Sequence, residues 1–110
     1  MHNYQLFFTD YFGDEIAAEH AKPASKAEIL DIMQRILTES DNFLGIVDQT
    51  DTTLQFMVNQ DLSIYVDIPV MAKQGSYGKN VTLREALQIV EQLQALINME
   101  QITDLEFSPW

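Results

Sequence analysis

The sequence predicts an α+β domain in which two helices pack on one face of an antiparallel sheet. Segments 54–58 and 62–70 alternate apolar with polar residues, which is typical of strands with one buried face. Two other segments place apolar residues at helical spacing, and each follows a capping box. The predicted order is β-α-β-β-β-α-β, and helices set apart from successive strands favour an antiparallel sheet. With 110 residues, 46% of them hydrophobic, residues 1–110 are expected to form one domain.

The first strand is expected between Asn3 and Phe12, where aromatic residues that favour strands alternate with other residues. Acidic rather than basic residues accompany this aromatic cluster, so we expect it to pack in the core instead of stacking on nucleic acid. Residues 13–24 are predicted to be a connection, because Gly13 ends the strand and Lys22 precedes a proline, which disfavours a helix. The aromatic cluster consists of Tyr4, Phe7, Phe8, Tyr11 and Phe12.

The first helix is expected to begin after Ser25, because S-K-A-E is a capping box in which Ser25 and Glu28 bind each other's backbone amides. Asp31 and Arg35 have the spacing of a favourable ion pair on the polar side of this helix. Polar residues 38–42 should end it, and a strand buried on both faces should follow at 43–47, with a turn at 48–52. The apolar stripe of the helix is Ile29, Leu30, Ile32, Met33, Ile36 and Leu37.

Residues 54–70 are predicted to form the central hairpin. Residues that face each other across an antiparallel pair point to the same side, and the apolar positions here are all even-numbered, so the loop must hold an odd number of residues. A three-residue loop, Asn59-Gln60-Asp61, would pair Val58 with Leu62. The side expected to face the helices carries Leu54, Phe56, Val58, Leu62, Ile64 and Val66. The opposite side carries Gln55, Met57, Asn59, Ser63, Tyr65 and Asp67.

Residues 71–80, which contain two glycines, are predicted to be a flexible surface loop. They precede a helix, as a phosphate-binding P-loop does. However, Gly75 and Gly78 are three positions apart instead of five, and Asn80 replaces the hydroxyl residue that holds magnesium. Nucleotide binding is therefore not expected.

A second helix is expected to begin after Thr82, where T-L-R-E is another capping box, and to end near Asn98. The last strand is expected at 102–110, where Pro109 stops it. The indole of Trp110 should pack over the edge of the core, and a role as a binding anchor is the alternative.

Acidic residues dominate the chain: seventeen Asp and Glu oppose six Lys and Arg, for a net charge of −11. No Lys or Arg occurs between Arg35 and Lys73 or after Arg84, so two tracts are acid-only. Such a surface repels nucleic acid and anionic membranes and speeds association with a basic protein. Simple solubility is the alternative explanation of the charge.

The sequence contains no recognisable catalytic, metal or cofactor motif. It has no cysteine, and its two histidines, His2 and His20, are far apart and badly placed for a zinc site or a triad. Asp48-Gln49-Thr50-Asp51 lacks the spacing of a calcium loop. We therefore expect a protein that is not an enzyme and needs no cofactor. The first residues do not resemble a secretory signal and no run is long enough to span a membrane, so a cytoplasmic location is expected.

From about Ser25 to Trp110 the chain resembles the immunity proteins of bacterial polymorphic toxin systems, and most nearly the Imm1-like group. The resemblance rests on the strand rhythm F-L-G-I-V, L-Q-F-M-V and L-S-I-Y-V, the helix opening T-L-R-E-A-L and the ending L-E-F-S-P-W. It implies a protein of bacterial competition that binds a cognate toxin, often a basic nuclease, and blocks its active site. No site residue is carried over from the resemblance.

The expected partner is thus a basic toxin protein, without nucleic acid or membrane binding. The residues expected to bind it come from the acidic turns, from the outward face of the hairpin and from the 71–80 loop. They are Asp48, Asp51 and Asp61 of the turns, Tyr65 and Asp67 of the outward face, and Tyr77 of the loop. Two alternatives predict other features. An inhibitor that imitates nucleic acid would array carboxylates along one edge, and a small ligand-binding domain would have a deep pocket.

Overall fold

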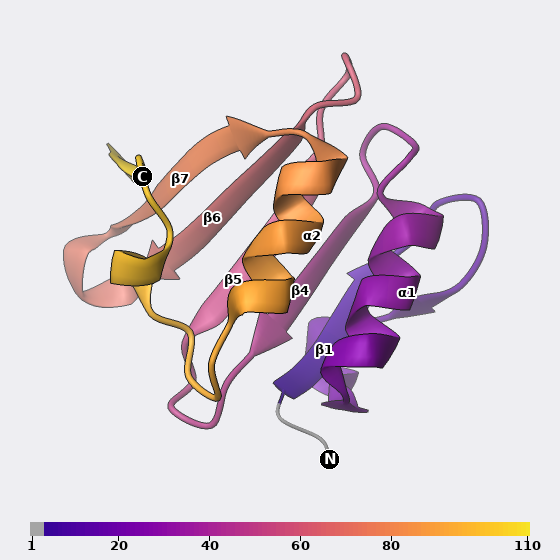
Figure 1. The fold of residues 1–110 in the computed structure, drawn as a ribbon, viewed down its shortest axis with the longest axis horizontal. Coiled ribbons are helices and arrows are strands. Elements are labelled where there is room, and N and C mark those ends of the chain that lie inside the picture. The colour runs from indigo at the N-terminus through magenta and orange to yellow at the C-terminus, as the bar shows by residue number, and fades with distance from the viewer. Residues whose placement is uncertain (1–3) are drawn as a thin grey trace.

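The computed structural model describes residues 4–110, so His2 and the first residue of the strand expected from Asn3 lie outside the described residues. The described part folds into an eight-stranded antiparallel sheet in the order β2-β1-β4-β5-β6-β7-β8, with β3 paired to β1 beside β2 (Figure 1). The strands are β1 (Tyr4–Thr9), β2 (Glu15–Ile16), β3 (Lys22–Ala24), β4 (Phe43–Val47), β5 (Thr53–Val58), β6 (Ile64–Val70), β7 (Gly75–Val81) and β8 (Glu106–Pro109).

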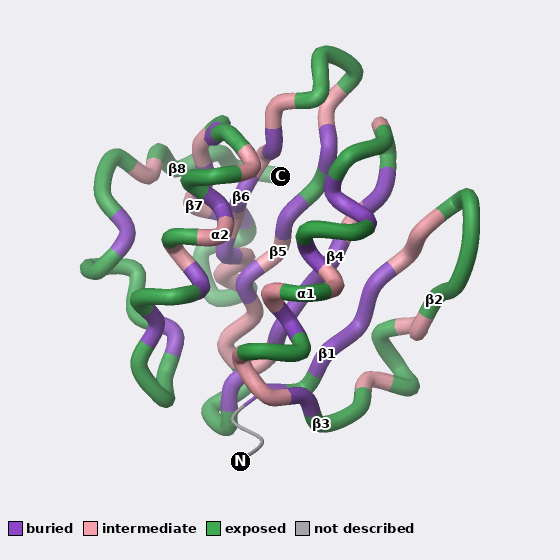
Figure 2. Tube along the Cα trace, turned by 45° about the vertical axis from the view of Figure 1, so that its right-hand side comes forward, coloured by how far each residue is buried: buried purple, intermediate pink, exposed green. Residues whose placement is uncertain are grey.

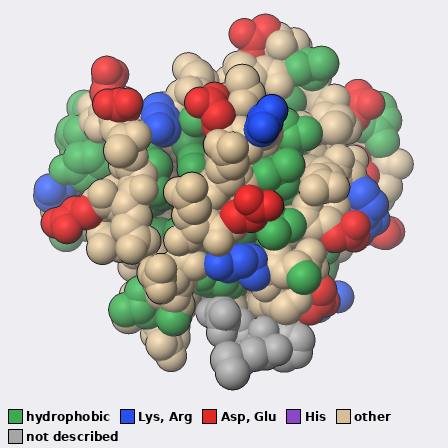
Figure 3. All heavy atoms as spheres, viewed as in Figure 1, with side chains coloured by type: hydrophobic (Ala, Val, Ile, Leu, Met, Phe, Trp, Pro, Cys, Tyr) green, Lys and Arg blue, Asp and Glu red, His purple; other side chains and the backbone are tan. Residues whose placement is uncertain are grey.

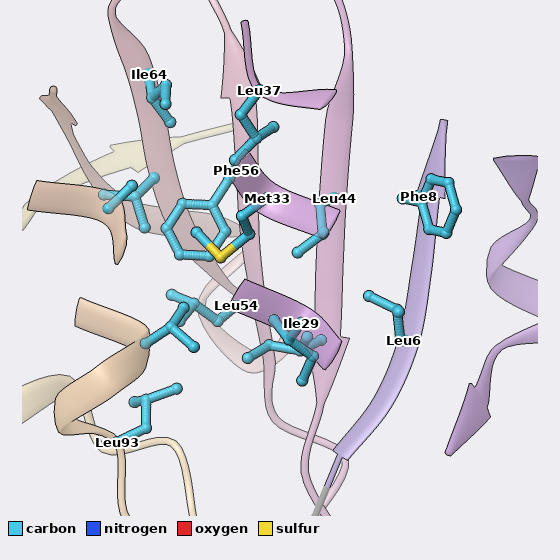
Figure 4. Close-up of a cluster of buried hydrophobic side chains, with 14 of the residues drawn as sticks. Leu6, Phe8, Ile29, Met33, Leu37, Leu44, Leu54, Phe56, Ile64 and Leu93 are labelled. Carbon is cyan, nitrogen blue, oxygen red and sulfur yellow. The ribbon is translucent and has the colours of Figure 1, made fainter. Parts of the chain in front are cut away.

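Both α-helices, α1 (Lys26–Ile36) and α2 (Leu83–Gln92), lie side by side on the same face of the sheet (Figure 1), which confirms the predicted α+β fold class. Ile29 and Met33 of α1 point toward Leu44, Leu54 and Phe56 of the sheet (Figure 4). All five of these side chains are fully buried. The core therefore fills the space between the helices and the even-numbered residues of β4, β5 and β6.

The two capping boxes begin the helices where the sequence predicted them. Glu28 N donates to Ser25 Oγ at 3.2 Å, and Ser25 N donates to Glu28 Oε1 at 3.1 Å. At α2, the amides of Glu85 and Thr82 make the same reciprocal bonds at 3.1 and 2.9 Å. A capping box is complete within four residues, so local sequence is sufficient to place it.

Helix α2 ends at Gln92, six residues earlier than predicted. Lys26 of α1 donates its Nζ to the carbonyls of Glu91 and Leu93 at 3.0 and 2.7 Å, which provides partners for carbonyls that the helix leaves free. Ile97 is still buried, because it packs on the core from an irregular segment instead of from a helix.

The predicted hairpin forms, and its strand residues face the sides of the sheet that were predicted, but the predicted pairing of residues across it is wrong. Val58 faces Ile64 instead of Leu62, so the turn holds five residues, 59–63, and the pairing is shifted by two. Asp61 Oδ1 accepts hydrogen bonds from the N–H and hydroxyl of Ser63 at 3.0 and 2.6 Å, which stabilises the longer turn. Leu62, expected in the core, has a left-handed φ of 70° and is 56% exposed.

Residues 71–80 are mostly a strand, not the predicted loop. After a short 3-10 turn, η2 (Met71–Lys73), the chain forms β7, which pairs with β6 and β8. A Cβ on Gly78 would lie 2.4 Å from the hydroxyl of Tyr65. The glycine is needed because a tyrosine of the neighbouring strand crosses over it, and this contact is not visible from local sequence.

The predicted connection at 13–24 contains two short strands and a 3-10 turn, η1 (Ala18–His20), packed on β1. At the other end, the last strand is shorter than predicted, and Pro109 is its final residue. The edge position of β8 tolerates a proline, because no further strand needs its N–H. The Trp110 side chain is 66% exposed, so the prediction that it packs over the core edge is wrong; only its backbone N–H is held, by Gln74 O at 2.8 Å.

Candidate partner-binding surface

The face of the sheet that points away from α1 and α2, hereafter the open face, is not covered by either α-helix. Successive strand residues point to opposite faces, and the even-numbered residues of β4, β5 and β6 are buried under the helices. The open face therefore carries the odd-numbered residues of these strands and their partners in β7. Exposed residues are otherwise concentrated in the turns and on the outer sides of the helices (Figure 2).

Strand register places apolar and aromatic side chains in one row across the open face. Phe43 faces Met57, Met57 faces Tyr65, and Tyr65 faces Asn80. Met57 is 50% exposed and Phe43 and Tyr65 are half-buried. The strands that carry this row are already ordered by the buried core beneath them. A partner that binds the row therefore loses little additional entropy by ordering it.

Asp67 lies in the middle of the next row, between Gln55 of β5 and Gly78 of β7. Partial burial between these strands raises the pKa of the Asp67 carboxyl, and a hydrogen bond from the Ser76 hydroxyl offsets part of this rise. The fold thus keeps an incompletely solvated carboxylate at the centre of the open face, with no Lys or Arg in the described residues bound to it.

The helix side of the sheet carries charges of both signs, whereas the charged residues on the strands of the open face are acidic. All six Lys and Arg lie in the described residues, and each sits on a helix, on η2 or at a strand position that shares the helix side, as Lys79 does opposite Val66. On the helix side, Lys and Arg are interspersed with Asp and Glu (Figure 3). By register, the charged residues of the open face are acidic: Glu15, Asp67 and Glu106.

A hollow of about 390 Å³ adjoins the open face where β4 begins and β5 ends. Its apolar lining comes from Tyr11, Phe12, Phe43 and Met57, and Asp41 adds a carboxylate. Tyr11 is 64% and Phe12 is 77% exposed, so the expectation of core packing is wrong for these two residues, although Tyr4, Phe7 and Phe8 are buried. The sequence analysis assigned the whole aromatic cluster to the core and so missed this part of the surface.

Hydrogen bonds fix the turn that presents Tyr11 and Phe12. The buried amide of Asn42 accepts from Tyr11 N at 3.0 Å and donates to Asp10 Oδ1 at 2.9 Å. Asp10 Oδ1 also accepts from Phe12 N at 3.1 Å. The two aromatic side chains are therefore exposed on a backbone that is already ordered, which lowers the entropy cost of using them in binding.

The structure uses Asp48, the first predicted partner-binding residue, inside the fold. Its side chain is buried, and Oδ2 accepts from Ile97 N at 2.8 Å. Its Oδ1 accepts from Thr50 N, Thr50 Oγ1 and Thr52 N at 2.8, 2.7 and 3.0 Å. These hydrogen bonds hold the pKa of the Asp48 carboxyl below its usual value even though burial opposes them.

The other predicted residues do not form one surface. Asp51 follows β4 and Asp61 follows β5, so these two turns lie at opposite ends of the sheet (Figure 1). Tyr77 pairs with Ile68 and so lies on the helix side, where its hydroxyl accepts from Lys73 Nζ at 2.7 Å. Only Tyr65 and Asp67 share the open face, and Met57 and Phe43 belong with them.

Within residues 4–110 there is no group of three or more histidine, cysteine or acidic residues arranged to hold a metal ion. None of the helices in this part of the chain is both long and apolar enough to cross a membrane. Comparison with protein families, curated proteins and solved structures finds no match to the chain.

Proposed function

We propose that this protein is an immunity protein that binds a basic toxin domain through the open face and the adjoining Tyr11–Phe12 turn, and thereby blocks the toxin. One observation carries the proposal: a sheet face that neither α-helix covers presents exposed Met57 and half-buried aromatic side chains, and the charged residues that its strands place there are all acidic. The resemblance of residues 25–110 to Imm1-like immunity proteins supports the same function.

The composition of this surface suits protein recognition. Binding energy at protein interfaces concentrates in a few large side chains, with aromatic residues and methionine enriched, and polar residues surround them. Tyr11, Phe12 and Met57 would supply such anchors around the hollow, and a side chain of the partner would fill it. The acidic residues around the anchors would attract a basic partner and orient it.

Asp67 is the residue we assign to a partner Arg or Lys. A cation placed against a partly desolvated carboxylate gains a charge-assisted hydrogen bond and relieves the cost of ionising that carboxylate. The same contact would lower the pKa of Asp67 on binding. Partner binding should therefore release a proton near the pKa of free Asp67 and strengthen as the pH rises through it.

Protein binding accounts for this surface better than imitation of nucleic acid. A nucleic-acid mimic needs carboxylates repeated along an edge, whereas the open face carries three carboxylates separated by apolar and amide side chains. Binding to a toxin should retain much of its strength in high salt, because the apolar anchors are not screened.

The test is to purify the protein with the product of its neighbouring gene and to measure the affinity of variants by calorimetry. Met57→Asn and Phe12→Ser should each weaken binding by about tenfold or more, as expected for an anchor. Leu62→Asn is the matched control, because Leu62 is as exposed as Met57 but lies in the 59–63 turn, and Asn tolerates its positive φ. Loss of affinity in Leu62→Asn, with normal binding by the two surface variants, would place the interface elsewhere.

A further inference from the structure

A second surface feature lies away from the open-face row, at the end of the sheet where the 48–52 turn lies. It is a groove of about 650 Å³ between the end of β6 with η2 on one side and residues 96–100 on the other. Its walls are mostly apolar and its lining also includes the buried side chains of Ile68 and Ile97. The apolar residues of the walls are Pro69, Val70, Met71, Leu96 and Met99.

Large apolar side chains of the groove are unusually exposed. Met71 is 77%, Leu96 is 42% and Met99 is 36% exposed, and Met71 is 25 or more residues away in the chain from the other two. Contiguous exposed apolar surface of this kind marks interaction sites. Two of the three side chains are methionines, whose flexible thioethers adapt to the shape of an inserted partner.

The charge of the groove restricts the partner. Its charged lining residues are Asp51 and Glu100, and both are acidic. The nearest cation in sequence, Lys73, is directed to Tyr77, whose hydroxyl it contacts at 2.7 Å. A partner with Lys or Arg beside its apolar side chains is complementary to this arrangement, and an anionic partner would be repelled.

The backbone of the groove favours a helix over an added strand. Pairing of β6 with β5 ends at Asp67, so Ile68–Val70 have a free edge there. Pro69 has no N–H, which makes this three-residue edge a poor template for an extended segment. A helix satisfies its own backbone hydrogen bonds and docks through side chains alone.

We infer that the Met71–Met99 groove binds a basic amphipathic helix of a partner protein. Large apolar side chains on one face of that helix would lie between Met71, Leu96 and Met99. Lys or Arg side chains at the flanks would reach Asp51 and Glu100. The groove does not include Met57, Tyr65 or Asp67, so the inference does not depend on the function proposed for the open face.

The test uses a synthetic amphipathic helix of leucine and lysine, about 18 residues long so that it can be helical on its own, with the methionine methyl groups of the full chain followed by NMR. The peptide should shift the signals of Met71 and Met99 and leave those of Met57 and buried Met33 unchanged. A peptide of the same composition in scrambled order, and one with glutamate in place of lysine, should bind at least tenfold more weakly.

Variants separate specific docking from general attraction to an acidic protein. Met71→Ser combined with Met99→Ser should weaken peptide binding by about tenfold, whereas Met57→Ser, at a similarly exposed methionine of the open face, should not change it. Asp51→Asn with Glu100→Gln should reduce the salt dependence, and Asn suits the φ of 65° at position 51.

Three results would overturn the inference. Equal binding of the scrambled peptide would show adsorption to negative charge. A shift confined to Met57 would move the site to the open face. Self-association of the chain that is abolished by the Met71 and Met99 substitutions would make a second copy, and not a basic helix, the occupant of the groove.

Discussion

The carboxylate of Asp48 accepts a hydrogen bond from the backbone N–H of Ile97 at 2.8 Å, across 49 residues of sequence. This contact ties the turn after β4 to the irregular segment that follows α2. It also explains why an aspartate is buried here: the turn and the Ile97 amide together provide four donors to its two oxygens. Asp48 is therefore a residue of the fold and is left out of the proposed binding surface.

We predict that Asp48→Ala lowers the free energy of unfolding by about 3 kcal/mol, because it leaves the buried Ile97 amide without its acceptor. Chemical denaturation measures this loss. Asp51→Ala serves as a control from the same turn with an exposed side chain, and should cost less despite its positive φ. An equal loss in the two variants would contradict the role given to Asp48.

The stability of the wild-type protein should depend on Asp48 at low pH. The folded state holds the pKa of this carboxyl below its value in the unfolded chain, so the unfolded state binds the proton first as the pH falls. The contribution of Asp48 is present in full above the unfolded pKa of about 3.9 and is lost as the pH falls through the lower folded value. The difference in stability between wild type and Asp48→Asn should shrink over that range, as denaturation at several pH values would show.

Asp67 should show the opposite behaviour, because its pKa is raised in the folded protein. Ionising it costs folding free energy above the unfolded pKa, so Asp67→Asn should stabilise the protein at pH 7 and have little effect near pH 3. The same substitution should weaken binding of a basic partner. A variant that is both less stable at pH 7 and unchanged in binding would refute the assignment of Asp67 to the partner.

The buried amide of Asn42 should be essential to the Tyr11–Phe12 turn. Asn42 Nδ2 donates to Ile36 O at 2.8 Å as well as to Asp10, so one side chain joins the end of α1 to this turn. Asn42→Ala should lower stability by about 2–3 kcal/mol. Amide exchange at Tyr11 and Phe12 should become faster than in the wild type, whereas exchange that stays slow in this turn would show that Asn42 does not order it.

Gly45 and Phe7 should be energetically coupled. A Cβ at position 45 would lie 2.1 Å from Cζ of the Phe7 ring and meets only that ring among its closest neighbours. Gly45→Ala alone should destabilise the fold by about 2 kcal/mol through overpacking, and Gly45→Ala combined with Phe7→Leu should lose less than the sum of the single changes. Additive losses in this double-mutant cycle would show that the ring does not fill the space above Gly45.

Local features of the chain were predictable from sequence, and features set by distant contacts were not. The caps at Ser25 and Thr82 involve residues three positions apart, and the alternation at 54–70 fixed which residues face the helices. The pairing of the two strands is shifted by two residues, and hydrogen bonds between Asp61 and Ser63 stabilise the longer turn. The alternation of apolar and polar residues could not predict this shift, because a shift of two leaves every side chain on the same face.

The candidate site was predicted only in part for the same reason. Tyr65 and Asp67 followed from alternation. The strand at 75–81 forms by pairing with β6 and β8, and the buried Asp48 carboxylate binds the amide of Ile97, so neither is visible within a short window of sequence. The exposed pair Tyr11 and Phe12 resembles a core segment in composition, and the hydrogen bonds to Asn42 and Asp10, with the backbone bond from Gly13 N to Asp10 O, show that a turn carries it.

The most direct test of the proposed function is the methyl NMR spectrum of the methionines in the protein bound to the product of its neighbouring gene. Met57 reports on the open face, and Met33, a fully buried residue of α1, reports on the fold. Binding through the open face predicts a large change in the Met57 signal, reached at about tenfold higher partner concentration in Phe12→Ser, while Met33 stays unchanged. A tight complex in which the Met57 signal does not move would contradict the proposal.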